Sequence, residues 1–353
     1  MTTIWIRAET KANEERAPIS PSDAARLIAA GFKLVVEDSP ARALPIKAYQ
    51  VAGCEIAAEG AWREAPKDAF IIAVKEMPEG DDFPLTHRHI HFGHMFKDQP
   101  GWREGLARFK AGGGILYDLE NLVGDDGRRV AAFGYWAGFA GAALGLKLWA
   151  GQQDKAAPAL APLRAYANKA AMFSEIDTLL DERTPSALIT GALGRCGKGA
   201  SDMLEAVGVR VTKWDMAETA SGGPFPEILD HDIFVNALLA APGIPVFVPK
   251  DAPTRPGRRL TSIADVSCDP SSAYNPIPIY DRSTTFGDPI VEIATEGAPL
   301  AVMAIDHLPS LLPIESSEDF SAQLLPSLMT LNQPDQGVWA RAKADFDAAM
   351  ARL

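Results

Sequence analysis

The chain has 353 residues, 47% of them hydrophobic and 23% charged, so its composition is that of an ordinary globular protein and its length predicts two domains. It carries 46 Asp and Glu against 34 Lys and Arg, a formal net charge of -12. A chain this acidic is a poor partner for nucleic acid or an anionic membrane surface. We expect neither, and we expect any anionic small molecule to be held by a local group of Arg and Lys side chains.

The cysteines and the N-terminus predict a cytoplasmic protein. Cys54, Cys196 and Cys268 are too few and too scattered for a disulfide framework, which favours a reducing compartment. Arg7 and its charged neighbours stand where a secretory signal would need an apolar core. Residues 130–146 are uncharged and reach the lower length limit of a membrane span. Their regularly spaced glycines instead predict a helix packed closely on another element, so we expect no membrane segment.

Strands and helices alternate at the start of the chain. Residues 4–6 are predicted to form a strand that runs into a charged loop. Ser20 and Pro21 mark the start of a helix, because serine is a favoured N-cap and proline a favoured first residue. Gly31 is predicted to end that helix, and residues 32–36 to form the next strand.

Three further apolar runs, at residues 70–74, 90–95 and 114–117, predict strands of a parallel sheet that is covered on both faces, because they lack alternation. In open parallel sheets, ligands bind outside the carboxyl ends of the strands. Ionisable side chains follow one predicted strand after another, namely Arg7, Lys11, Lys75, Glu76, His94 and Glu120. We therefore expect a catalytic cleft at this edge.

Four histidines are crowded into the same region, His87, His89, His91 and His94. Strand alternation would put the first three on one face, as a metal site requires, but no cysteine joins them. We expect these three to be core or surface histidines, and we expect no bound metal.

The second half of the chain contains a candidate dinucleotide site. Helices are predicted over residues 128–151 and 168–182, followed by a strand over residues 186–190. Glycines at 191, 194 and 197 then form a turn before a helix over residues 198–207. Such a strand, glycine turn and helix present backbone N–H groups to a phosphate. The spacing is G-x-x-G-x-x-G instead of the usual G-x-G-x-x-G, and glycines that merely allow tight packing are the alternative.

The next predicted strand, residues 209–214, ends at Asp215. A carboxylate about 20 residues after the turn would hold a ribose 2′-OH and repel a 2′-phosphate, which favours NAD over NADP. Later strands are predicted at residues 233–235, 260–266 and 302–305. A helix over residues 338–353 is predicted to pack back on the first domain.

Several longer motifs carry a family resemblance. They are Arg7-Ala8-Glu9-Thr10-Lys11, Lys75-Glu76-Met77-Pro78, His94 with Lys97-Asp98-Gln99, Leu116-Tyr117-Asp118-Leu119-Glu120, residues 127–134, the glycine turn, and residues 305–313. Together they make the chain resemble the NAD-dependent, lysine-forming saccharopine dehydrogenases of fungi, from about residue 4 to the C-terminus. Alanine dehydrogenases and nicotinamide nucleotide transhydrogenases are the wider relatives.

The resemblance implies an α/β fold of two Rossmann-like domains with parallel sheets and an interdomain active-site cleft. Residues 1–135 with 322–353 would form the substrate domain, and residues 136–321 the dinucleotide-binding domain. It also implies a monomer that uses NAD to oxidise saccharopine and hydrolyses the resulting imine to L-lysine and 2-oxoglutarate. Lys75 would accept the proton of the secondary amine, and His94 would serve as the acid–base group for water addition and carbinolamine collapse.

The resemblance further assigns ligand contacts. Saccharopine would be contacted by Arg16, Lys75, Gln99, Arg129, Phe133, Ser267, Cys268 and Asp269. NAD would be contacted by Arg128, Gly194, Arg195, Asp215, Thr219, Val266, Ile305, Asp306, His307 and Leu308. Supporting roles would fall to Lys11, Glu76, Lys97 and Glu120. The arginines suit this role chemically, because guanidinium groups match the carboxylates of saccharopine.

Two points stay open at this stage. A lysine acts as a base near neutral pH only where burial or a nearby cation favours its uncharged form, and Lys11 could supply that cation whereas Glu76 works against it. The sequence also admits an alanine-dehydrogenase-like or other amino-acid or opine dehydrogenase, and a non-catalytic NAD-binding protein. One departure from the fungal pattern is Ala237, which stands where a disulfide partner for Cys196 is expected.

Overall fold

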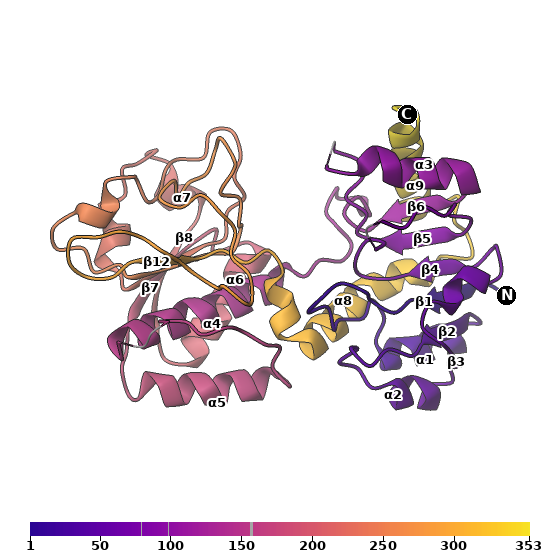
Figure 1. Ribbon diagram of the computed structural model, residues 1–353, viewed down its shortest axis with the longest axis horizontal. Coiled ribbons are helices and arrows are strands. Elements are labelled where there is room, and N and C mark those ends of the chain that lie inside the picture. Colours follow the sequence, from indigo (N-terminus) through magenta and orange to yellow (C-terminus); the bar gives the residue numbers. More distant parts are fainter. Residues whose placement is uncertain (79, 98, 156–157) are drawn as a thin grey trace. The chain divides into compact units, whose positions relative to one another are not determined.

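The computed structural model describes residues 1–78, 80–97, 99–155 and 158–353, so Asp98 of the predicted motif lies outside the described residues. The chain forms two compact units (Figure 1). The first unit contains Met1–Ala132 and Pro313–Leu353, and the second contains Phe133–Leu312. Each unit has its own six-stranded sheet, as the predicted Rossmann-like α/β class requires.

The sheet of the first unit is wholly parallel. Its strands are β1 (Thr3–Ile6), β2 (Lys33–Glu37), β3 (Glu55–Ala57), β4 (Phe70–Ile72), β5 (Arg88–His91) and β6 (Ile115–Asp118). Their spatial order is β3-β2-β1-β4-β5-β6. The order reverses between β1 and β4, and sheets of this kind bind ligands outside the carboxyl ends of the strands at that point.

The helices of the first unit are α1 (Pro21–Ala29), α2 (Ile46–Val51), α3 (Trp102–Gly112), α8 (Pro313–Leu328) and α9 (Gly337–Met350), with a 3-10 turn at Ala61–Glu64. Ser20 caps α1 as predicted, and its Oγ accepts the Asp23 N–H at 3.2 Å. Trp339 of α9 lies edge-on to Tyr117 of β6, with ring centroids 5.6 Å apart. The prediction that the C-terminal helix packs back on the first unit is therefore confirmed.

The predicted strand over residues 90–95 is wrong in its bounds, because β5 covers Arg88–His91. The side chains of His87, His89 and His91 are buried in a row of edge-to-face rings, and His89 also packs on Trp62 at 5.5 Å. The core side chains of this strand therefore include histidine rings, whereas the prediction of an apolar run relied on aliphatic residues. His94 has a left-handed φ of 53° and lies beyond the strand.

The second sheet has five parallel strands and one antiparallel edge strand. Its strands are β7 (Ser186–Thr190), β8 (Arg210–Trp214), β9 (Ile233–Asn236), β10 (Ser262–Asp265), β11 (Val291–Glu292) and β12 (Ala301–Met303), in the spatial order β11-β12-β10-β9-β7-β8. Only the β11–β12 pair is antiparallel among these. The helices of this unit are α4 (Gly134–Gln153), α5 (Lys169–Leu180), α6 (Arg195–Ala206) and α7 (Met216–Thr219), with 3-10 turns at Pro226–Asp230, Ala252–Thr254 and Leu308–Leu311.

Two predicted helix starts are wrong. The helix expected from residue 128 begins at Gly134, because the preceding segment folds back on itself through a Val123–Arg129 bridge and a bond from Gly124 N–H to the Arg128 carbonyl (2.8 Å). The helix expected from residue 198 begins at Arg195, so the glycine turn is shorter than predicted.

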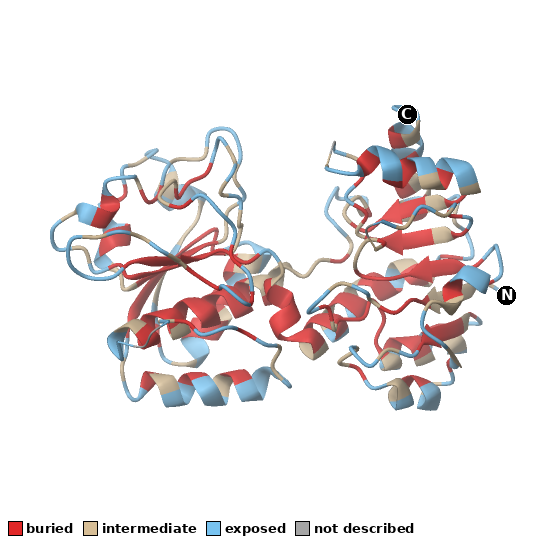
Figure 2. Cartoon of the chain, viewed as in Figure 1, coloured by how far each residue is buried: buried red, intermediate tan, exposed pale blue. Residues whose placement is uncertain are grey.

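Glycines allow α4 and α6 to cross closely. A Cβ on Gly138 would lie 1.7 Å from the Cys196 carbonyl oxygen, and a Cβ on Gly199 would lie 1.9 Å from the Tyr135 carbonyl oxygen. The predicted close packing of this glycine-rich helix is confirmed, and Figure 2 shows α4 buried along most of its length. Within the described part of the chain, no helix combines the length and apolar character needed to span a bilayer.

We expect Gly199→Ala to lower the free energy of unfolding by about 1–3 kcal/mol, because the added methyl group must push α4 and α6 apart. Thermal unfolding of the full chain would show this as a lower midpoint. Gly287→Ala is the matched control, since a Cβ there meets nothing nearer than Thr285 Oγ1 at 3.9 Å. Equal midpoints for the two variants would contradict the close crossing.

Candidate active site

The carboxyl edge of the first sheet gathers ionisable side chains at the ends of consecutive strands. Arg7 follows β1, Lys75 follows β4 by three residues, His94 follows β5 by three residues, and Glu120 follows β6 by two. Because these strands are neighbours in the order β1-β4-β5-β6, the four residues are brought to one edge. Two groups of charges form there, one around Glu76 and one around Glu120.

In the first group, Lys11 Nζ lies 2.8 Å from Glu76 Oε1. Burial favours the neutral acid at Glu76, but the hydrogen bond from Lys11 and the nearby Lys75 hold its pKa below the ordinary value. Glu14 binds Arg16 in a buried bidentate pair, with distances of 2.7 and 2.6 Å. Arg16, predicted to grip a substrate carboxylate, therefore already has a carboxylate of this chain on its guanidinium, which the sequence did not reveal.

The second group centres on Glu120. Its carboxylate lies 2.8 Å from Lys97 Nζ, 3.1 Å from the Arg129 guanidinium and 3.7 Å from His94 Nδ1. The interactions with His94 and Lys97 lower the pKa of Glu120 to about 2. In return, the Glu120 carboxylate raises the pKa of His94 despite its partial burial. The sequence placed these residues at the site but did not pair them.

Asp118 holds the backbone of this second group. Its Oδ1 accepts the Glu120 N–H at 2.8 Å, and its Oδ2 accepts the Gly93 N–H at 3.2 Å. The residue is buried, and desolvation raises its pKa to about 6. The sequence analysis did not predict a role for Asp118. The signal that could have revealed one is an acidic residue at the end of a buried apolar run.

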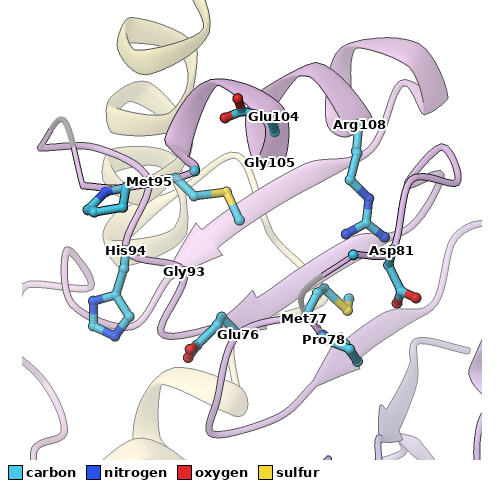
Figure 3. A pocket seen from close by; sticks show the side chains of 13 residues that line it. Glu76, Met77, Pro78, Asp81, Gly93, His94, Met95, Glu104, Gly105 and Arg108 are labelled. Atoms are coloured by element: carbon cyan, nitrogen blue, oxygen red, sulfur yellow. The ribbon is translucent and has the colours of Figure 1, made fainter.

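A cavity of about 460 Å³ adjoins His94 (Figure 3). Glu76 and His94 lie on one side of it, Arg108 and Asp81 on the other, and the Met77 and Met95 side chains between them. Its lining combines polar and apolar side chains, and some of the polar ones were not predicted to belong to the site. Gln99, a predicted substrate contact, instead uses its amide oxygen to accept the Lys97 N–H at 2.7 Å.

His89 and His91 are fully buried, and desolvation lowers the pKa of both rings, to about 3 for His91. His87 contacts the Ala65 carbonyl oxygen through Nε2 at 3.0 Å. These three rings are packed core residues in the structure. This agrees with the interpretation of the sequence that takes them as core histidines instead of metal ligands. Among the described residues, no group of three or more His, Cys, Asp or Glu could hold a metal ion.

The glycine turn of the second unit has the shape of a phosphate cradle. Gly191 has a φ of +72°, and a Cβ on Gly197 would lie 2.1 Å from the Gly191 carbonyl oxygen, so both positions need glycine. Gly194 is the N-cap of α6, and no described side chain caps it. The first N–H groups of α6 have no partner within the helix, and this end attracts anions. A dinucleotide pyrophosphate fits this arrangement.

Asp215 ties the end of β8 to the glycine turn. Its Oδ2 accepts the Leu193 N–H at 3.0 Å, its Oδ1 accepts the Met216 N–H at 2.9 Å, and Thr219 Oγ1 donates to its carbonyl oxygen. Three largely exposed apolar side chains follow adjacent strands at this edge, namely Leu193, Met216 and Leu239. Sequence reasoning did not predict this apolar rim.

A buried polar chain lies at the ends of the neighbouring strands. Asn236 Nδ2 donates to Asp265 Oδ1 (3.0 Å), and the Tyr280 hydroxyl donates to Asp265 Oδ2 (2.6 Å). Asp265 also accepts the N–H groups of Ser267 and Cys268 at 3.2 and 3.3 Å. Asp265, for which no role was predicted, therefore fixes the segment that was predicted to contact the substrate.

The remaining predicted contacts divide between the units. Arg128, an expected NAD contact, lies in the first unit with the catalytic candidates, whereas Phe133 and Asp269, expected substrate contacts, lie in the second. Gly194, Arg195, Asp306 and His307 lie in the second unit with Val266, Ile305 and Leu308. The side chains of Ile305 and Leu308 are buried in the core, so a ligand could meet these two residues only through their backbone. All three cysteines are free.

The fold is similar to that of alanine dehydrogenases, which have two α/β units. The solved structure of an L-alanine dehydrogenase matches with a TM-score of 0.68 at 16% identity, over 99% of this chain and 94% of that one. The family model described as "Alanine dehydrogenase/PNT, N-terminal domain" matches residues 5–140.

Sequence comparison narrows this class to one family. The saccharopine dehydrogenase (NAD(+), L-lysine-forming) of Candida albicans is 45% identical over 99% of this chain and 97% of its own length. The Schizosaccharomyces pombe protein of the same name is 46% identical over 99% of both chains. The chain belongs to the NAD-dependent, L-lysine-forming saccharopine dehydrogenase family.

The His94–Glu120 contact predicts a pH effect. Glu120→Gln removes the anion that stabilises the imidazolium, so the proton should leave His94 at lower pH and the pKa of His94 should fall. NMR titration of the histidine ring protons, with His94→Gln for assignment, would measure this. Glu104→Gln, an exposed change beside the same cavity, should leave the midpoint in place. A midpoint that stays the same in Glu120→Gln would show that Glu120 does not set the charge of His94.

Proposed function

We propose that the chain catalyses the reversible, NAD-dependent oxidation of saccharopine followed by hydrolysis to L-lysine and 2-oxoglutarate. The observation that carries the proposal is the presence of Lys75 and His94 beyond the ends of adjacent strands β4 and β5, in a chain that matches lysine-forming saccharopine dehydrogenases over nearly its full length. NAD, when bound, supplies the hydride acceptor.

Lys75 accepts the proton of the substrate's secondary amine. Glu14 and Glu76 lie near enough to its ammonium group for that charge to lower their pKa values. Lys11 neutralises Glu76 at 2.8 Å, which weakens the pull of that carboxylate on the Lys75 proton. Lys11 and Glu76 thus act as supporting residues.

His94 acts in the hydrolytic half of the reaction. Glu120 lies beside Nδ1, which leaves Nε2 as the nitrogen for the substrate. Because Glu120 raises the pKa of His94, more of the ring is protonated near neutral pH, as the collapse of a carbinolamine with loss of an amine requires. Lys97 and Arg129 also contact the Glu120 carboxylate, and their positive charges keep Glu120 ionised.

Residues of both units contribute contacts to the substrate and to NAD. Arg129 is partly exposed and grips a substrate carboxylate, whereas Arg16 acts as a fixed charge held by Glu14. Gly194 and Arg195 at the start of α6 hold the pyrophosphate, and Asp215 holds the ribose. The exposed apolar rim around Leu193 takes the adenine face. Hydride transfer needs the substrate carbon and the nicotinamide in contact, so the reaction requires both units.

We also propose that the enzyme works as a monomer in the cytoplasm. Its three free cysteines suit a reducing compartment. Light scattering coupled to size-exclusion chromatography tests the first part of this statement.

The activity is tested by following NADH oxidation with lysine and 2-oxoglutarate, with each omitted in turn. We expect turnover only when both are present, because the imine forms between them. Pyruvate with ammonia is the comparison for an alanine-dehydrogenase activity and should give little rate. NADH binding without turnover on either pair would overturn the proposal and leave a non-catalytic binding protein.

We expect Lys75→Met to lower kcat by about 100-fold or more, because the reaction loses its base. The Kd for NADH should stay within twofold, since the glycine turn lies in the other unit. Lys110→Met, at an exposed position on α3, is the control for loss of a lysine from the same unit. Unchanged turnover in Lys75→Met would remove Lys75 from the mechanism.

A further inference from the structure

Two buried side chains hold the backbone on which Lys75 is mounted. The carboxylate of Glu9 accepts the N–H of Val74 at 2.5 Å with one oxygen and the N–H of Lys75 at 3.1 Å with the other. The guanidinium of Arg7 donates to the Lys75 carbonyl oxygen at 2.7 Å and to the Glu76 carbonyl oxygen at 3.4 Å. Both backbone polar groups of Lys75 are therefore bound by side chains.

The sheet itself cannot supply these partners. On the side of β5, backbone pairing continues past the strand through Ala73 N–H to Ile90 and Phe92 N–H to Val74. On the side of β1, the last bond runs from Arg7 N–H to the Ile72 carbonyl oxygen at 2.9 Å, and the chain then leaves the sheet. Side chains from that departing loop take the place of the missing strand. An unpaired buried N–H would be costly, so the contact is strongly favoured.

Arg7 also supports the charged form of Glu9, because its guanidinium works against the rise that burial causes in the pKa of Glu9. The side chains of Arg7 and Glu9 are only 2% and 5% exposed, and their nearest charged atoms are 3.9 Å apart. A charged acceptor makes a stronger hydrogen bond to a backbone N–H than a neutral one. The pair therefore grips the segment from Val74 to Glu76 from both its N–H and its carbonyl side.

We propose that Glu9 and Arg7 are positioning residues that fix the segment Val74–Glu76 and thereby the place at which Lys75 presents its amine for proton transfer. The inference rests on the proposed function, in which Lys75 is the base. Glu9 and Arg7 act through the backbone of Lys75.

Such a device is needed because proton transfer demands heavy atoms within about 2.6–3.2 Å of each other. A lysine side chain is long and flexible. Any movement of its backbone therefore adds to the positional freedom that the side chain already has. A displacement of about 1 Å at a reacting group can cost about 100-fold in rate.

The test is a double-mutant cycle with Glu9→Gln and Lys75→Met. Glutamine has nearly the shape of glutamate, but it can accept only one of the two N–H groups and turns a donor toward the other. In the wild-type background we expect Glu9→Gln to lower kcat about 10-fold, with the Kd for NADH within twofold. In the Lys75→Met background the same change should have almost no effect, because there is no base left to misplace.

Asp23→Asn is the matched control. Asp23 is a buried carboxylate of the same unit, and it accepts hydrogen bonds from the Ser321 hydroxyl and the Arg26 guanidinium instead of the N–H groups beside Lys75. It should lower the midpoint of thermal unfolding and leave kcat of the folded enzyme within twofold. If the role of Glu9 is merely structural, Glu9→Gln will behave like Asp23→Asn, or its effect on kcat will be equal in the two Lys75 backgrounds. Either result overturns the inference.

If Glu9→Gln does not fold, Arg7→Lys replaces it in the cycle. Lysine keeps the charge beside Glu9 but lacks the Nη2 group that donates to both carbonyl oxygens, so the same pattern is expected, and additive effects reject it. Failure of the proposed function is seen separately, because the wild-type chain would then not oxidise NADH with lysine and 2-oxoglutarate. With wild-type activity present and Lys75→Met impaired, the cycle tests the positioning pair alone.

Discussion

Peptide groups lose their hydrogen-bond partners where parallel strands end, and buried carboxylates take the partners' place at the carboxyl edges of both sheets. Glu9 accepts the N–H groups of Val74 and Lys75, and Asp118 accepts those of Gly93 and Glu120. In the second unit, Asp265 accepts those of Ser267 and Cys268. A carboxylate can accept several N–H groups at once: Glu9 and Asp118 use one oxygen for each, and Asp265 accepts both through Oδ1. The candidate side chains of Lys75 and His94 thus lie on or beside backbone that is fixed from within the core.

The charges of the site are balanced locally, although the chain as a whole is acidic. Glu120 is surrounded by His94, Lys97 and Arg129, and Glu76 is paired with Lys11. A carboxylate beside an imidazole favours the imidazolium, and a cation beside a carboxylate weakens the pull of that carboxylate on other protons. The pKa of His94 is accordingly raised, and the pKa values of Glu120 and Glu76 are lowered, within a single sheet edge.

Glycines serve two purposes in the second unit. Gly191 supplies the left-handed turn and Gly197 the close approach that open the start of α6 to a pyrophosphate. Gly138 and Gly199 let α4 lie against α6 with almost no side chain between them. Close packing is thus confirmed for the glycines at the crossing of α4 and α6, whereas phosphate binding by the glycine turn stays a prediction.

Local sequence signals determined most of the strands, though not β3 or β11, together with the Ser20 cap, the glycine turn and the list of ionisable residues at strand ends, because each depends on neighbours in the chain. They failed for β5, where buried histidines replaced aliphatic residues, and for the start of α4, where a bridge between Val123 and Arg129 delayed the helix. The resemblance to a family added the roles of Lys75 and His94. Only the tertiary structure decided which charges pair, such as Glu14 with Arg16 and Glu120 with three cations, and which acids bind backbone. Those choices depend on strand order and burial, and residues such as Glu9 and Lys75 become neighbours only after β1 and β4 have paired.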